Sequence, residues 1–332
     1  MRSMWKHQVR VLAVVTLISL CLSTSINFWE GDVRLNMAAM KNGEYNPYRE
    51  FNEWLNNLLF GLIGLSWLDG YVYEQLGGHE SAYYLMCYLR DLVAGTMVYW
   101  ITGGVWHLTI YGIYGKSLFE DRNREFPDPE VIRTQQIHAQ TSLFVYAALP
   151  VLSEYLIENK YTAVYFYVDQ IGGWAHYTFF FVAYIACVEV GIYWAHRTLH
   201  TNKWLYNNIH GPHHSYKSKD QLTPWASIAF HPLDGIIQAA PYVLCLLFVP
   251  VHYFTHFILL FFTGIWATNI HDAMWCDTEP IMGAKYHTMH HTHFIYNYGQ
   301  FFTFCDAFWG TLREPAKEPA VLPPKKGKKM VK

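Results

Sequence analysis

The sequence contains little charge. Asp, Glu, Lys and Arg make up 15% of its 332 residues, against roughly a quarter in an ordinary soluble domain. Its 24 Lys and Arg residues nearly balance 26 Asp and Glu residues, for a formal net charge of −2. No excess of basic charge is therefore available to bind nucleic acid. Because hydrophobic residues reach 52% and fall in long runs, the composition indicates an integral membrane protein.

The sequence also lacks paired cysteines. No two of the six form a CxxC motif, and most lie within apolar runs. We therefore expect small buried hydrophobic residues, which excludes a disulfide framework or a zinc ribbon as the basis of the fold. Internal repeats are absent as well.

Four apolar runs predict membrane-spanning helices, at residues 11–29, 92–115, 141–157 and 174–197. Each approaches the 20 or so residues that cross a hydrocarbon core of about 30 Å. Basic residues precede the first run and no small-x-small cleavage site follows it, so a retained signal anchor is favoured over a cleaved signal peptide. Pro150 predicts a kink in the third run.

A longer apolar run, residues 235–270, is divided by Pro250 into two halves of about 22 Å each. It predicts a helical hairpin or a close-packed pair of spans, and in both cases the two ends emerge on one side of the membrane. Positive charge in the loop 116–137 and in the C-terminal tail places that side in the cytosol. The predicted class is thus an all-α, multi-span membrane protein. Its regions are an N-terminal anchor (1–40), a transmembrane region (41–173), a catalytic domain (174–314) and a basic tail (315–332).

Histidine is concentrated in the second half of the chain, where 13 of the 18 fall between His196 and His293. Three motifs stand out: HRTLH, HGPHH and HTMHH, starting at His196, His210 and His287. Residues at i, i+3 and i+4 share one face of a helix, so several imidazoles can converge. Imidazole suits iron, zinc, copper and nickel. The predicted ligands are His196, His200, His210, His213, His214, His287, His290 and His291, with His271 as a ninth.

Eight or nine histidines are too many for one four-coordinate ion and suit a site of two metal ions. The alternatives are a disordered metal-storage tract or scattered interfacial histidines. Apolar helices separate the motifs and would bring them together, which argues against a tract. Pro212 disfavours a helical conformation at Gly211, so we expect HGPHH to straddle a loop–helix junction, whereas HTMHH fits one continuous helix.

One further histidine and four acidic residues are candidates to support the ligands. His231 is predicted as a ligand or as a neighbour of the ligands. Glu189 lies on the face that carries His196, where a carboxylate within a span is a functional hypothesis. Asp272 is predicted to hydrogen-bond a ligand's free ring nitrogen, and Asp234 and Asp306 are candidates for the same role. Six other histidines are predicted to lie outside the site: His107, His138, His176, His252, His256 and His293.

The three histidine motifs resemble those of the membrane fatty-acid hydroxylase/sterol desaturase superfamily. Further stretches narrow the resemblance to the Δ7-sterol C5(6)-desaturases (lathosterol oxidases), over about residues 174–314. These stretches are GIYWAHRTLH, LTPWASIAFHPLDGIIQAAP, VPVHYFTH, NIHDAM, MGAKYHTMHHT and NYGQF. One departure is Gln300, where some relatives carry histidine, so that position is not a ligand here.

The resemblance implies an endoplasmic-reticulum enzyme with a non-haem diiron centre. It implies O2 as co-substrate and electrons from NAD(P)H delivered through cytochrome b5 and its reductase. It also implies that the nine histidines are iron ligands. A C4-methylsterol oxidase or a lipid hydroxylase would carry the same motifs. A histidine-rich metal transporter should instead place its histidines and acids at mid-membrane depth, whereas here they gather at the predicted cytosolic ends of the spans.

Overall fold

The computed structural model describes residues 33–115, 126–216, 221–272 and 280–315, and they are mostly helical. The α-helices are α2 (Val33–Asn42), α3 (Pro47–Leu62), α4 (Leu68–Leu76), α5 (His79–His107), α7 (Pro129–Tyr146), α8 (Ala148–Glu158), α9 (Trp174–Thr201), α10 (Lys203–Leu205), α11 (Pro232–Cys245), α12 (Tyr253–Ile270), α13 (Ala284–His293) and α14 (Phe304–Phe308). Short turns of π-helix are η1 (Leu108–Ile113) and η3 (Tyr206–His210), and short turns of 3-10 helix are η2 (Val168–Ile171), η4 (His213–Ser215) and η5 (Pro224–Ala226). The helical prediction is confirmed.

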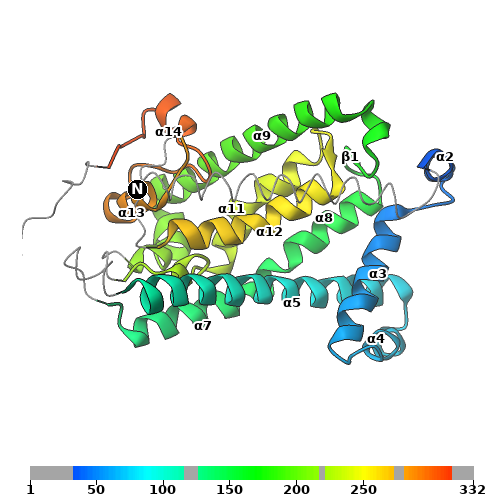
Figure 1. Cartoon of the computed structure of the whole chain (residues 1–332), viewed down its shortest axis with the longest axis horizontal. Coiled ribbons are helices and arrows are strands. Elements are labelled where there is room, and N and C mark those ends of the chain that lie inside the picture. Colours follow the sequence, from blue (N-terminus) through cyan, green and yellow to red (C-terminus); the bar gives the residue numbers. More distant parts are fainter. Residues whose placement is uncertain (1–32, 116–125, 217–220, 273–279, 316–332) are drawn as a thin grey trace, which may run out of the picture.

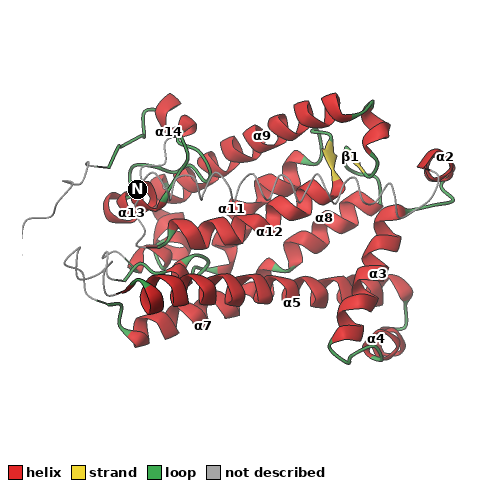
Figure 2. Ribbon diagram, in the orientation of Figure 1, coloured by secondary structure: helices red, strands yellow, loops and turns green. Residues whose placement is uncertain are grey.

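The long helices lie side by side along the molecule, with α11 packed against α9 and α12 packed against α5 (Figure 1). Helices α13 and α14 lie at one end of this bundle, and α3 and α4 lie at the other. Strands β1 (Val164–Tyr165) and β2 (Val251–His252) form one short parallel pair, far from α13 (Figure 2). The bundle therefore has a distinct end, at α13, to which the long helices deliver side chains.

Two of the described helices, α9 and α12, are long and apolar enough to cross a membrane. Helix α9 coincides with the predicted span 174–197. The predicted division of 235–270 is also found, since α11 ends at Cys245 and α12 starts at Tyr253. The predicted span 11–29 lies outside the described residues.

The other two predicted spans differ from the structure. Helix α5 starts at His79, well before residue 92, and continues as η1 to Ile113. The run 141–157 breaks at Ala147, between α7 and α8, rather than at Pro150. Pro150 lies in the first turn of α8, where its missing N–H costs no hydrogen bond, and its ring would clash with the carbonyl group of Tyr146 in a continuous helix.

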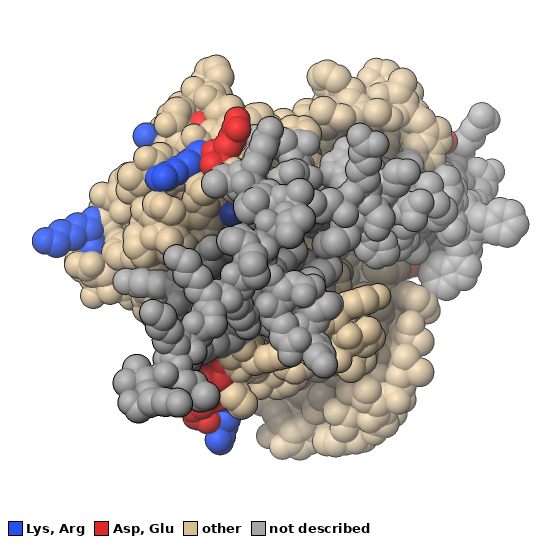
Figure 3. All heavy atoms as spheres, turned by 60° about the vertical axis from the view of Figure 1, so that its left-hand side comes forward, with Lys and Arg blue, Asp and Glu red and all other residues tan. Residues whose placement is uncertain are grey.

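The sides of the bundle expose large apolar residues. Phe179 on α9 is 68% exposed and Ile101 on α5 is 58% exposed. Figure 3 brings the α13 end forward, and the charged side chains among the described residues are few on that face. Large exposed apolar side chains along the sides of the bundle are expected where lipid covers a protein.

Candidate metal centre

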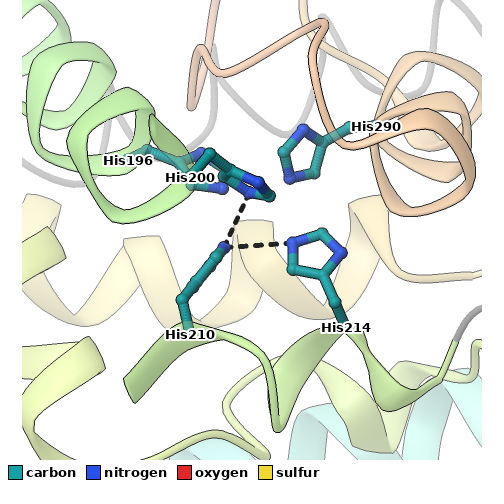
Figure 4. A group of neighbouring side chains, drawn as sticks. All are labelled: His196, His200, His210, His214 and His290. Atoms are coloured by element: carbon teal, nitrogen blue, oxygen red, sulfur yellow. Dashed lines mark hydrogen bonds between the residues drawn. The ribbon is translucent and has the colours of Figure 1, made fainter. Parts of the chain in front are cut away.

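Nine buried or half-buried histidines meet at the α13 end of the bundle, in two adjacent groups. The donor nitrogens within each group lie within 4.8 Å of one another. The first group is His196, His200, His210, His214 and His290. The second group is His213, His271, His287 and His291. The structure thus brings together all nine histidines singled out as ligands. Figure 4 shows the first group converging from three segments of the chain.

Each HxxHH motif is shared between the two groups. In HTMHH, His287 and His291 belong to the second group and His290 to the first. In HGPHH, His210 and His214 belong to the first group and His213 to the second. On a helix, the side chains at i and i+4 point in nearly the same direction. The side chain at i+3 lies on the other side of residue i. One HxxHH motif can therefore supply ligands to two neighbouring ions.

The local structure of the two motifs is only partly as predicted. HTMHH lies in one continuous helix, α13, as expected. HGPHH is interrupted, because the π-helical turn η3 ends at His210 and the 3-10 turn η4 starts at His213. The prediction for Gly211 is wrong, since this residue is helical, with φ −55° and ψ −37°. Proline disfavours a helical predecessor mainly through that residue's Cβ and N–H, and glycine has no Cβ.

Four of the nine rings are oriented through Nδ1. His196 is 2.9 Å from the carbonyl oxygen of Tyr298, and His290 is 2.8 Å from that of Tyr296. His271 contacts the carbonyl oxygen of Ala267 at 2.7 Å. In each case Nδ1–H donates and the proton is fixed there, which leaves Nε2 with a free lone pair. This is the arrangement that orients histidine ligands of metal ions.

A carboxylate orients a fourth ring. Nδ1 of His210 lies 2.7 Å from Oδ2 of Asp234, and both side chains are fully buried. The sequence pointed to Asp234 only as one of several acids. Its position, three residues after His231 and at the start of α11, gave no sign that it would contact His210. That contact joins two separate elements.

The free Nε2 atoms face one another. His210 Nε2 is 2.9 Å from His200 Nε2 and 3.0 Å from His214 Nε2. In the second group, His287 Nε2 is 3.0 Å from His271 Nε2 and 3.2 Å from His291 Nε2. Ligands bound at about 2.1 Å to one ion lie about 3 Å apart when their bonds are at right angles. The spacings therefore fit two metal ions, one for each group.

Two further observations support a metal site. Within the described residues, the buried Nε2 atoms of His196 and His290 have no hydrogen-bond partner, a costly state unless a ligand binds there. Burial lowers the pKa of His271 to about 4 and that of His290 to about 3. Burial, reinforced by neighbouring histidines, holds the pKa of His213 well below its usual value. These imidazoles are neutral at physiological pH, as metal ligation requires.

His231 and Asp272 lie outside both groups. His231 caps the first turn of α11, where Nδ1 accepts a hydrogen bond from the backbone N–H of Leu233 at 3.2 Å. The proline that follows His231 favours a helix start here. Asp272 accepts a hydrogen bond from the indole Nε1 of Trp106 at 2.9 Å. His231 thus supports the start of α11, and Asp272 joins the end of α12 to α5.

Glu189 supports a loop rather than a ligand directly. Its carboxylate accepts hydrogen bonds from the backbone N–H groups of Gln300, Phe301 and Phe302 at 2.9–3.1 Å. The same loop carries Tyr298, whose carbonyl oxygen orients His196. Glu189 thus acts on the site through the 298–302 loop.

Asp306 holds the other end of this loop. Its two carboxylate oxygens accept hydrogen bonds from the backbone N–H groups of Tyr298 and Gly299, each at 2.8 Å. Gly299 lies so close to the carbonyl oxygen of Phe302 that a Cβ would be 2.3 Å from it. The loop is therefore fixed by two acids and by a position that only glycine can occupy.

We expect Glu189→Gln to destabilise the protein by about 2–4 kcal/mol, because the amide NH2 would face buried backbone N–H donors. Thermal unfolding of the detergent-solubilised protein measures the change. Glu130→Gln, at an exposed position on α7, is the control and should melt like the wild type. Equal melting temperatures for all three proteins would show that the loop is held by other contacts.

The six histidines predicted to lie outside the site are not members of the two groups. His107 accepts a hydrogen bond from the indole of Trp225 at 3.2 Å, and His256 is hydrogen-bonded to Tyr184 at 2.8 Å. His252 packs against aromatic rings near β1, at the opposite end of the bundle. The other three are His138, His176 and His293, and they too lie outside the two groups.

A cavity leads from the histidines into the bundle. His196, His213, His271 and His287 line one end of it. Its walls come mainly from apolar residues of α5, α7, α8, α11 and α12, among them Val98, Leu143, Leu149, Leu260 and Ile270. A hydrocarbon substrate can therefore reach the histidines without leaving an apolar environment.

Comparison with known proteins agrees with this geometry. Residues 181–311 match the fatty acid hydroxylase family. The chain is 40% identical over 236 residues to a Δ7-sterol C5(6)-desaturase of Nicotiana tabacum, covering 71% of this chain and 86% of the relative. It is 34% identical over 218 residues to lathosterol oxidase of Rattus norvegicus, covering 63% of this chain and 69% of the relative. No solved structure matches the chain.

The matched segment contains all nine histidines, Glu189, Asp234 and the 298–302 loop. The similarity therefore covers both histidine groups and the residues that orient them. The chain belongs to the Δ7-sterol C5(6)-desaturase family, within the fatty acid hydroxylases.

Proposed function

We propose that the protein introduces the C5=C6 double bond into Δ7-sterols during sterol biosynthesis. The observation that carries this proposal is the pair of histidine groups at the end of an apolar cavity, in a chain 40% identical to a Δ7-sterol C5(6)-desaturase. A sterol dissolves in the bilayer, and an apolar cavity beside a metal site suits it.

The reaction consumes O2 and two electrons. The sterol loses one hydrogen from C5 and one from C6, and these, with two electrons and two protons from a donor, reduce O2 to two molecules of water. Two iron ions would supply the oxidising power to break unactivated C–H bonds. We propose that NAD(P)H supplies the electrons through cytochrome b5 reductase and cytochrome b5.

The protein's own residues would hold and protect this centre. We propose that the nine histidines bind the two ions, five from the first group and four from the second. Asp234 and the backbone carbonyl groups hold the ring protons on Nδ1 and so present Nε2 to the metal. The apolar cavity walls exclude bulk water and keep the reacting carbon atoms next to the ions.

The arrangement in the membrane follows from the same residues. Helices α9 and α12 end at the histidine groups, with His200 on the last turn of α9 and His271 just after α12. We propose that this end faces the cytosol from the endoplasmic-reticulum membrane, where a soluble electron-carrying domain can approach it. The anchor at 11–29 remains part of this proposal.

Sterol profiling tests the function. Cells that lack their own C5-desaturase and express this chain should regain Δ5,7-sterols, which gas chromatography–mass spectrometry measures. Continued accumulation of Δ7-sterols, with good expression and available cytochrome b5, would contradict the proposal. Loss of C4-methylsterols without gain of Δ5,7-sterols would indicate a C4-methylsterol oxidase, and a hydroxylated product would indicate a hydroxylase.

A further inference from the structure

We propose that the side-chain oxygen of Gln238 accepts a hydrogen bond from the 3-hydroxyl group of the sterol and so sets which ring carbons face the metal centre. This inference rests on the proposed function and names the contact that orients its substrate. Gln238 lines the cavity from α11, one helical turn after Asp234.

The orientation of the Gln238 amide is fixed by its neighbour. Nε2 donates a hydrogen bond to Oδ1 of Asp234 at 2.7 Å, while Oδ2 of Asp234 lies 2.7 Å from Nδ1 of His210. A carboxylate only accepts hydrogen bonds, so the NH2 group of Gln238 must face Asp234. Its carbonyl oxygen, Oε1, is left without a partner among the described residues and is available to a hydroxyl group in the cavity.

Two other hydroxyl groups along the cavity already donate hydrogen bonds to backbone carbonyl oxygens. The hydroxyl of Tyr99 donates to the carbonyl oxygen of Trp225 at 2.9 Å, and that of Thr263 donates to the carbonyl oxygen of Leu259 at 3.0 Å. A sterol hydroxyl that leaves water needs an acceptor, because an unpaired buried hydroxyl is costly. Gln238 offers an acceptor held in place by a second hydrogen bond.

The position of Gln238 suits the reaction. It is two hydrogen bonds away from the ring of His210, so a hydroxyl group bound to it lies near the metal end of the cavity. In a sterol, C3 and C5 belong to the same ring and only C4 separates them. A 3-hydroxyl group held by Gln238 therefore brings C5 and C6 toward the metal centre.

The rest of the cavity accommodates the remainder of the molecule. Along α5 the lining residues run about 12 Å from Tyr99 back to Asp91, and from Tyr99 the cavity continues to His271 and the other histidines. This length matches an elongated ligand with its hydroxyl at the metal end and its side chain deeper in the bundle. Asp91, at the far end, accepts a hydrogen bond from Nε of Arg90 at 3.0 Å through Oδ1, and its Oδ2 has no partner among the described residues.

The test compares two substrates in two proteins. The substrates are 5α-cholest-7-en-3β-ol and its 3-deoxy analogue, 5α-cholest-7-ene, and the proteins are the wild type and Gln238→Met. Methionine keeps the length of glutamine but lacks both its carbonyl oxygen and the NH2 group that donates to Asp234. We expect wild-type kcat/KM to favour the alcohol by about tenfold, and the variant to show nearly equal values because the alcohol alone loses a contact. Iron content is measured in both proteins, because a change in iron content affects both substrates equally and leaves the ratio of their kcat/KM values unchanged.

Binding provides a readout that does not require a working metal centre. Equilibrium binding of the two sterols to the iron-free protein in detergent should show the same loss of preference in Gln238→Met. If Gln238→Met still prefers the alcohol over the 3-deoxy analogue, the inference is overturned. It is also overturned if only Gln300→Leu loses this preference, since Gln300 also lines the cavity. The wild-type protein could bind the alcohol preferentially and yet form no Δ5,7-sterol. That result would contradict the proposed function but not the proposed contact between Gln238 and the hydroxyl group.

Discussion

His291→Ala is expected to lose an iron ion and to abolish sterol desaturation. His291 is 1% exposed, its Nε2 lies 3.2 Å from that of His287, and it belongs to the group of four histidines. A group of four has no spare ligand, so its ion should be lost. Loss of a residue that only orients a metal ligand typically lowers activity roughly 10- to 100-fold. We expect loss of the ligand itself to lower activity by more than that.

His293→Ala is the matched control, because His293 lies two residues further along the same helix. It is exposed, and its Nδ1 lies 3.1 Å from the carbonyl oxygen of Met289 on its own helix. Iron per chain, measured by plasma mass spectrometry, and Δ5,7-sterol formation should both stay at wild-type values. Equal losses in the two variants would mean that α13 acts through its folding rather than through His291 as a ligand.

Asp234→Leu should weaken iron binding about 10- to 100-fold, with a parallel loss of activity at limiting iron. Leucine has the branched shape and the number of side-chain heavy atoms of aspartate but cannot accept a hydrogen bond from Nδ1 of His210. That ring would then be free to turn, and its buried N–H would be left unpaired. Iron titration of the metal-free protein measures the affinity.

The control for Asp234→Leu is Asp69→Leu, at an exposed position on α4 and at the opposite end of the bundle. It should bind iron like the wild type. Excess iron should restore part of the activity of Asp234→Leu, because the nine histidines are still present. If excess iron restores nothing while the protein remains folded, Asp234 has a role beyond orienting His210.

The sequence singled out the nine histidines that the structure brings together, because their spacing carries the information. Residues at i, i+3 and i+4 on a helix must lie on one face, and apolar helices of matching length bring such faces to one end. The assignment of each histidine to one of two groups was not predicted. Spacing alone does not reveal that His290 turns toward His196 while His291 turns toward His213.

The supporting acids were harder to predict, since their contacts join elements that are distant in the chain. Glu189 was considered for its position on the face of His196, yet it binds a loop more than 100 residues away. From the sequence, Asp234 and Asp272 were both candidates to hydrogen-bond the ring of a ligand histidine. Only the packing of α11 against η3 brings Asp234 to His210.

The central claim is that the two histidine groups bind two iron ions, and metal analysis combined with Mössbauer spectroscopy of active protein tests it most directly. The account predicts two iron ions per chain, magnetically coupled because the groups are adjacent, and one ion fewer in His291→Ala. Full desaturase activity with a single iron ion per chain, or with another metal in its place, would contradict it.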